Sequence, residues 1–355
     1  MFLKDYWYVA AWDYEISDKP LGRTVLGEPI VLYRKADGSP VALQDRCPHR
    51  QAPLSMGKVI GDELQCGYHG LRFNCEGACT AVPSQTRIPP NAKVKTYPVV
   101  ERYRWIWIWM GDPAKADSSL ITDYHWLESP EWRAKGDVIH VRCNWQLIID
   151  NLLDLSHLAF VHTSTIGNIA VAAPSEFKVE RKMESVTITL WMLDAPPPPS
   201  FLRTGRFPNH VNVDRWLITD YTPPGFVRIN SGATEAGTGA PQGKRIGGVG
   251  FRNLDAITPE TERTTHYFWA QAHDFAVNDP ETTERVFLQV REAFLEDTAI
   301  LEAQQKLIDL DPGAPIIHLA ADAGGVEARR IVERLLKAQN NNTTPVGSTA
   351  IKAHV

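Results

Sequence analysis

Two short motifs that combine cysteine with histidine constrain this chain more than any other feature of its sequence. Cys47 and His49 stand in the first motif, CPHR, and Cys66 and His69 stand in the second, CGYHG, sixteen residues further on. Thiolate sulfur and imidazole nitrogen are both metal ligands, and the proline and glycines beside them favour turns. Two loops that each offer one thiolate and one imidazole predict a shared metal site.

Two kinds of metal centre use two cysteines and two histidines. A Rieske 2Fe-2S cluster has two cysteines on one iron and two histidines on the other, whereas structural zinc sites usually join C-x2-4-C to H-x3-5-H. Each pair is mixed in this chain, so the spacing favours the cluster over zinc. The other three cysteines (Cys75, Cys79 and Cys143) fall outside the motifs and are expected to be free thiols.

The charge balance and the ends of the chain exclude several classes of protein. Its 37 basic and 42 acidic residues are scattered, so the sequence has no basic stripe for nucleic acid. The N-terminus lacks the apolar core of a signal peptide, and the densest apolar run, residues 105–110, is too short to span a bilayer. We expect a soluble, cytoplasmic protein without nucleic-acid or membrane partners.

The chain divides into stretches that differ in their predicted secondary structure. Residues 1–112 contain short strand-like runs separated by close turns, which predicts a small all-β domain. Residues 113–337 combine longer strand-like runs with helical patterns over 145–162 and 282–310, which predicts a domain of antiparallel sheet plus helices. The fold class is therefore α+β. Residues 338–355 have the composition of a polar C-terminal tail.

A second group of polar residues lies in the apolar stretch NWQLIIDNLLDLSHLAFVH. Asn151, Asp154 and His157 recur at i, i+3 and i+6, and His162 follows five residues later. An amphipathic helix with a satisfied core histidine would explain any one of them, but two histidines among leucines also suit a metal. A shared metal requires a π-turn, or a helix that ends before His162, because i+5 turns two side chains apart on a straight α-helix.

A third ligand for such a metal can come from the helix predicted near residue 290, which carries Glu296 and Asp297. Asp297 lies on the apolar stripe that should face the core, where a carboxylate needs a partner. Glu296 follows Glu292 by four residues on a more polar face, where a solvated charge is a sufficient explanation. We therefore choose Asp297, since two imidazoles and one carboxylate form the facial set of non-haem iron(II) oxygenases.

Several motifs along the chain resemble those of one family. C-x-H followed by C-x-x-H is the Rieske signature, and DNLLDLSHLAFVH resembles the mononuclear-iron motif of the Rieske non-haem iron oxygenases. WYVA, CPHRQAPLS, GYHGL and FLED fit the same family. The resemblance implies an N-terminal Rieske domain followed by a catalytic domain, in which His157, His162 and Asp297 bind a mononuclear Fe(II).

The resemblance also implies an assembly. The resemblance implies a ring-shaped homotrimer in which the cluster of one subunit supplies electrons to the iron of its neighbour. Asp154 is then expected to join His157 of one chain to His69 of the next, with Asn151 close to the metal.

WYVA, DNLLDLSH and DAGG (residues 322–325) are most similar to the vanillate O-demethylase and toluenesulfonate methyl-monooxygenase group. That similarity implies O-demethylation or methyl hydroxylation of a small aromatic acid, with O2 as co-substrate. The chain has no dinucleotide fingerprint, so NAD(P)H and flavin are expected on a separate reductase.

Three other functions stay open: a ring-dihydroxylating dioxygenase, an N-demethylase, and a Rieske electron-transfer protein without oxygenase activity. An aromatic acid needs a cation or hydrogen-bond donor, and Arg228, Asn230 and Arg252 lie on candidate strands. Each of them could equally be a surface residue.

Overall fold

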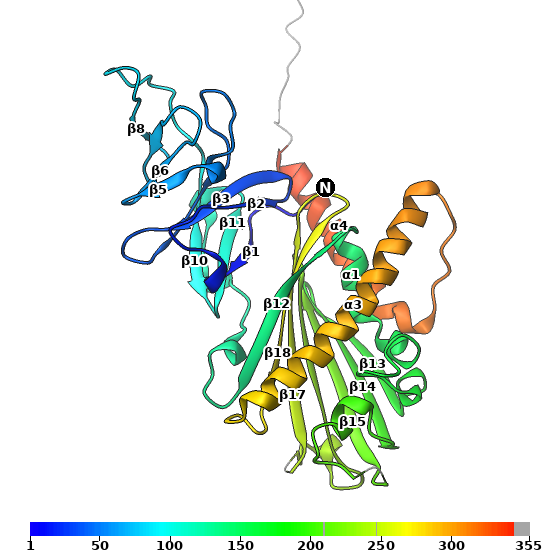
Figure 1. Ribbon diagram of the computed structural model, residues 1–355. Helices are drawn as coiled ribbons and strands as arrows, with labels where there is room; N and C mark the ends of the chain where they lie inside the picture. The colour runs from blue at the N-terminus through cyan, green and yellow to red at the C-terminus, as the bar shows by residue number, and fades with distance from the viewer. Residues whose placement is uncertain (209, 246, 344–355) are drawn as a thin grey trace, which may run out of the picture.

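The computed structural model describes residues 1–208, 210–245 and 247–343. Figure 1 shows three small sheets in the N-terminal part (blue to cyan) and one large sheet with helices in the rest of the chain. This arrangement confirms the predicted α+β class, with an all-β region first and an antiparallel sheet plus helices second.

The small sheets of the N-terminal part are antiparallel, in the orders β1-β11-β10, β2-β3-β4-β9 and β5-β6-β7-β8. Their strands are β1 (Tyr6–Trp12), β2 (Leu21–Val25), β3 (Glu28–Arg34), β4 (Pro40–Gln44), β5 (Lys58–Ile60), β6 (Glu63–Gln65), β7 (Arg72–Phe73), β8 (Cys79–Ala81), β9 (Thr96–Tyr97), β10 (Val99–Arg102) and β11 (Trp105–Met110). The run WIWIWM forms β11 and is buried on both faces, which explains why it shows no alternation of apolar and polar residues.

The large sheet is antiparallel, in the order β12-β18-β17-β16-β15-β14-β13. Its strands are β12 (Arg133–Val141), β13 (Glu176–Arg181), β14 (Val186–Ala195), β15 (Val213–Thr222), β16 (Phe226–Glu235), β17 (Val249–Pro259) and β18 (Thr265–His273). Adjacent residues of a strand face opposite sides of the sheet, so each strand contributes to two separate layers of side chains.

Helices cover one face of this sheet. They are α1 (Trp145–Leu153), α2 (Pro199–Leu202), α3 (Pro280–Leu310) and α4 (Ala323–Thr343). The longest, α3, begins where Asp279 caps it by accepting a hydrogen bond from the backbone of Glu281. One core cluster joins α1, α3 and α4 to the sheet through residues such as Ile149, Phe294 and Trp269.

The N-terminal part packs against the opposite face of the large sheet. Trp7 and Trp107 share a core cluster with Ala256 and Phe268, which lie on β17 and β18. The contact also includes polar groups: Thr258 Oγ1 donates to the carbonyl of Val9 at 2.7 Å. The large sheet therefore separates the N-terminal domain from helices α1 and α3. None of the helices in the described residues combines the length and apolarity needed to cross a bilayer.

Two boundaries differ from the sequence predictions. A single helix over 145–162 is wrong, because α1 ends at Leu153 and the Asp154 carboxylate caps a new 3-10 turn, η6 (Leu155–Ala159), by accepting from Ser156 N. The helix does end before His162, as a shared metal requires.

The polar tail also begins later than predicted. Residues 338–343 form the last turns of α4, and the Gln339 side chain accepts from Lys4 N at 2.7 Å and donates to the carbonyl of Phe2. These bonds fix the end of the helix to the N-terminus. The rest of the predicted tail, 344–355, lies outside the described residues.

Candidate active site and metal centres

The two cysteine-histidine motifs fold into loops with the same backbone pattern. Cys47 N donates to the carbonyl five residues ahead, and its own carbonyl accepts from Gln51 N; Cys66 makes the corresponding bonds with Leu71 and Gly70. The residue four positions after each cysteine has a positive φ, 59° at Gln51 and 74° at Gly70. Each loop thus folds back on its cysteine, which holds the thiol at a fixed position.

The four predicted cluster ligands come together at the tips of these loops. Cys47 and Cys66 are buried, and their thiols are within hydrogen-bond reach of each other. His49 and His69 are exposed, with ring centroids 4.5 Å apart. Burial raises the pKa of the Cys47 thiol to about 11, and the adjacent Cys66 adds to the rise. A buried thiol pair beside an exposed imidazole pair fits the donor set of a Rieske cluster.

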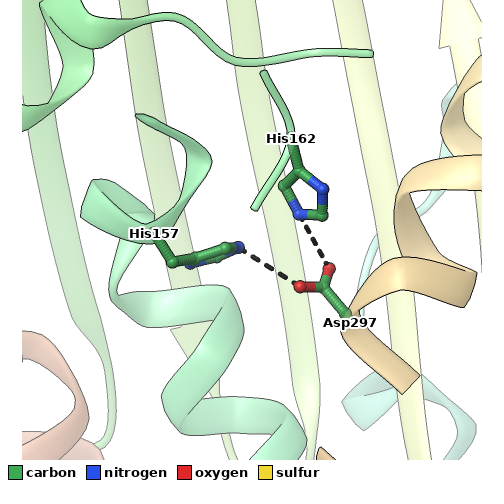
Figure 2. Close-up of side chains that lie close together, drawn as sticks. All are labelled: His157, His162 and Asp297. Atoms are coloured by element: carbon green, nitrogen blue, oxygen red, sulfur yellow. Dashed lines mark hydrogen bonds and ion pairs between the residues drawn. The ribbon is translucent and has the colours of Figure 1, made fainter. Parts of the chain in front are cut away.

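The second predicted site also comes together. His157, His162 and Asp297 point toward one another (Figure 2), and one ligand atom from each lies within 4.8 Å of the other two. His157 Nε2 is 3.5 Å from Asp297 Oδ1, and His162 Nε2 is 3.1 Å from Asp297 Oδ2. Two imidazole nitrogens and one carboxylate that converge from one side fit a facial iron(II) set.

Three different elements supply these side chains. His157 lies in η6, His162 lies in the irregular segment after it, and Asp297 lies in the middle of α3. The carbonyl of His162 accepts from Thr165 N and Gly167 N, which closes the segment tightly. Gly167 is needed there, because a Cβ would lie 1.8 Å from the carbonyl oxygen of Leu158.

Two further residues orient the triad. Asn151 Nδ2 donates to Asp297 Oδ1 at 3.0 Å. Glu296 Oε2 accepts from His162 Nδ1 at 2.6 Å, so Glu296 is not the solvated charge that the sequence indicated. The segment that carries His162 packs over this side of α3 and covers the carboxylate, a long-range contact that helical periodicity does not reveal.

The pKa values of the two histidines shift in opposite directions. Burial lowers the pKa of His157, although Asp297 opposes the shift. Burial also acts to lower the pKa of His162, but the hydrogen bonds that Asp297 and Glu296 accept from its ring outweigh burial and raise that pKa. A neutral imidazole with its second nitrogen hydrogen-bonded is the form that binds metal, and the Glu296 contact selects Nε2 of His162 for this role.

Asp154 lies behind His157, outside the triad. Its backbone carbonyl accepts from His157 Nδ1, and its partly exposed carboxylate caps η6 through Ser156 N. The backbone of Asp154 thus fixes the His157 ring, so that Nε2 faces Asp297.

A cavity of about 750 Å³, including its open part, lies over the triad. It is lined mostly by apolar side chains, including Leu155, Leu217, Phe251 and Phe294. This apolar lining suits a small aromatic molecule.

The three polar residues that the sequence offered for substrate binding lie elsewhere. Arg252 donates to Asn230 Oδ1 at 2.6 Å and stacks on Trp132, and Arg228 donates to the carbonyl of Asp123. These side chains lie on the face of the sheet opposite the cavity.

Arg215, which the sequence analysis missed, does line the cavity. A signal for it exists in the sequence, because Arg215 shares the period-two face of its strand with the apolar residues Val213 and Leu217.

Both parts of the chain match known protein families. Residues 6–98 match the Rieske [2Fe-2S] domain, and residues 141–338 match the vanillate O-demethylase oxygenase C-terminal domain. The chain is 46% identical to the toluene-4-sulfonate monooxygenase system iron-sulfur subunit of Comamonas testosteroni, over 97% of this chain and 100% of that protein. It is 41% identical to a vanillate O-demethylase oxygenase subunit of a Pseudomonas strain, over 96% of each.

Among solved structures, dicamba monooxygenase bound to dicamba is similar at a TM-score of 0.87 and 33% identity, over 96% of this chain and 99% of that one. The matches span both the cluster loops and the cavity. The chain therefore belongs to the Rieske non-haem iron monooxygenases, in the group that carries the vanillate O-demethylase C-terminal domain.

Proposed function

We propose that this chain is the terminal oxygenase component of a multi-component monooxygenase that oxidises a small aromatic acid, by O-demethylation or methyl hydroxylation. The observation that carries the proposal is the buried convergence of His157, His162 and Asp297 beneath an apolar cavity. A Rieske electron-transfer protein has no use for such a site.

Each metal centre has its own residues in this proposal. Cys47, His49, Cys66 and His69 hold the 2Fe-2S cluster, while His157, His162 and Asp297 hold Fe(II). When bound, the cluster and the iron supply the electrons and the oxygen activation that the reaction needs.

The chain itself orients and shields the reacting groups. Asn151 and Glu296 keep Asp297 and His162 in their ligand orientations through hydrogen bonds of 3.0 and 2.6 Å. Apolar side chains such as Leu155 and Phe294 exclude water around the substrate.

We also propose a homotrimer in which Asp154 links His157 to His69 of a neighbouring copy. The large sheet supports this assembly, because the N-terminal domain packs on one face and the triad lies on the other, so that electrons within one chain would have to cross the sheet. The exposure of His49 and His69 leaves both rings accessible to a neighbour.

The remaining proposals concern partners and setting. The first domain spans residues 1–112, and the second spans the predicted residues 113–337 together with the end of α4 to residue 343. O2 is the co-substrate, and a separate reductase provides electrons from NAD(P)H through flavin. The chain works in the cytoplasm, in the breakdown of aromatic compounds. The relatives named as monooxygenase-system subunits and oxygenase components support a separate reductase.

The test combines metal analysis with turnover. The purified protein should be red-brown and contain about three irons and two acid-labile sulfides per chain, whereas an electron carrier would contain about two irons. With a compatible reductase, methoxy-, methyl- and N-methyl-substituted aromatic acids are then screened for formaldehyde, benzylic alcohol and cis-diol products. A colourless protein without sulfide, or a cis-diol as the main product, contradicts the proposal.

A further inference from the structure

Arg215 is the most unusual charged residue in the part of the chain that the structure describes. It lies on β15 and is 3% exposed, yet its Nε and Nη1 have no hydrogen-bond partner among the described residues. Its Nη2 donates to the carbonyl of Ile166 at 3.2 Å, and its guanidinium lies 5.3 Å from the ring centroid of Phe201.

No carboxylate among residues 1–208, 210–245 and 247–343 forms an ion pair with this guanidinium. The one acidic side chain that lines the same cavity among the described residues is Asp297, which belongs to the metal triad. Asp214, the preceding residue in the strand, faces the other side of the sheet and accepts from the backbone of Asp194 and Gly237. Burial lowers the pKa of Arg215 to about 10, which still leaves the group charged at neutral pH.

A buried, unpaired charge of this kind is costly, and each unpartnered N–H of the guanidinium can donate a charge-assisted hydrogen bond to an oxygen of an anion. The cavity also contains Ser200, a residue that is 8% exposed and whose Oγ has no hydrogen-bond partner in the described part of the chain. Neither group has a role in holding the metal. Both therefore point to a ligand that brings its own negative charge into the cavity.

We propose that Arg215 is the specificity-determining residue that binds the anionic head group, carboxylate or sulfonate, of the aromatic substrate. This inference rests on the proposed oxygenase function and deepens it, because the same cavity holds both the anion site and the triad. Pairing the head group with Arg215 fixes the substrate inside the cavity, and a neutral analogue leaves the guanidinium unpaired.

The chain provides a matched control in Arg252. It also lies on the large sheet, burial lowers its pKa to about 10 as well, and it points away from the cavity. Arg215→Gln and Arg252→Gln therefore remove the same charge from opposite faces of one sheet. Arg215→Lys keeps the charge but not the planar pair of donors.

The experiment titrates the metal-loaded enzyme by calorimetry with toluene-4-sulfonate, 4-methylbenzoate and the neutral toluene-4-sulfonamide. We expect the wild type to bind at least one anion about 100-fold more tightly than the sulfonamide. Arg215→Gln should lose about 100-fold in affinity for that anion, Arg215→Lys should lose less, and Arg252→Gln should bind like the wild type. The ratio between the two anions identifies the preferred head group.

Two results would overturn the inference while leaving the oxygenase function in place. One is a wild type that turns over aromatic substrates but binds the sulfonamide as tightly as the anions, which needs no variant to observe. The other is a folded Arg215→Gln, with the wild-type cluster spectrum, that keeps full affinity for the anions. A wild type that binds no probe and oxidises no aromatic acid instead contradicts the proposed function itself.

Discussion

Glu296 Oε2 accepts a 2.6 Å hydrogen bond from Nδ1 of His162, whose other ring nitrogen lies 3.1 Å from Asp297. Consecutive residues of α3 thus hold both sides of one imidazole. The contact fixes the ring and makes its Nε2 a better electron donor to a metal.

Glu296→Gln should weaken iron binding at the triad by about 10- to 100-fold, because the amide oxygen is a poorer acceptor for the imidazole N–H. The measurement is iron content after graded dialysis against a chelator, with acid-labile sulfide as the internal reference for the cluster. Glu292→Gln, one turn earlier on an exposed part of α3, is the control. Equal iron retention in both variants would show that the contact has no effect on the metal.

Asp154→Asn should lower turnover while both metal centres stay loaded. The asparagine keeps the cap on Ser156 and the backbone carbonyl that accepts from His157, so both metal centres are expected to stay loaded. Loss of the carboxylate charge should lower steady-state oxygen uptake by about 100-fold, if electrons pass through this residue. Cluster reduction by the reductase should remain normal. Normal repeated turnover in the variant contradicts the bridging role.

The sequence predicted which side chains converge at the two candidate metal centres better than it predicted the residues around them. The candidate cluster ligands occupy two short loops, so local spacing was enough to select them. Asp297 was recognisable because a carboxylate interrupts the apolar stripe of a long helix. The role of Glu296 depends on a segment 134 positions away in sequence, and no periodicity within α3 reports that contact.

Arg215 was missed for a related reason. Alternation along a strand separates two faces, but it does not say which face borders a cavity. Arg228, Asn230 and Arg252 were considered because they are polar, and the structure places them on the other face. The helix over 145–162 was extended too far because its apolar pattern continues across Asp154, where the chain begins a new turn.

His266 makes the stability of the domain contact sensitive to acid. Its Nε2 is 3.0 Å from the carbonyl of Thr24, across the contact between β18 and the N-terminal domain. Burial lowers its pKa to about 4, Arg23 and His140 act in the same direction, and Glu260 opposes them. The folded pKa lies below the unfolded value of 6.5, so this stability is complete above pH 6.5 and is lost as the pH falls toward 4.

Urea unfolding at pH 7 and pH 4.5 measures this effect. Between these two values the wild type should lose about 2 kcal/mol more unfolding free energy than His266→Gln, which has no titrating ring. His318→Gln, at an exposed position, should behave like the wild type. The same acid loss in all three proteins would show that His266 does not titrate in this way.

Asp255 should have the opposite pH dependence. Its side chain is fully buried on β17, where burial raises its pKa well above the ordinary value although a hydrogen bond from Tyr267 opposes the shift. The folded state holds a proton that the unfolded state releases above pH 3.8, so stability falls as the pH rises.

Asp255→Asn keeps the shape of the side chain and removes the carboxyl group that titrates. Thermal or urea unfolding should show that the unfolding free energy of the variant rises relative to that of the wild type as the pH increases above 4, by at most about 1.4 kcal/mol per pH unit. Asp18→Asn, at an exposed position, is the control. Parallel stability curves for the wild type and Asp255→Asn would contradict a protonated Asp255.

The sequence distances within the two metal centres set an order for their assembly. All four proposed cluster ligands lie within 23 consecutive residues, so their loops can close as soon as the small sheets have formed. His162 and Asp297 are 135 positions apart, and the strands β13 to β18 lie between them. During synthesis the cluster pocket is therefore complete while most of the second domain is still to be made, whereas the triad forms only after α3 has docked. Cofactor loading in the cell should follow the same sequence, with cluster insertion first and iron capture as the last step of maturation.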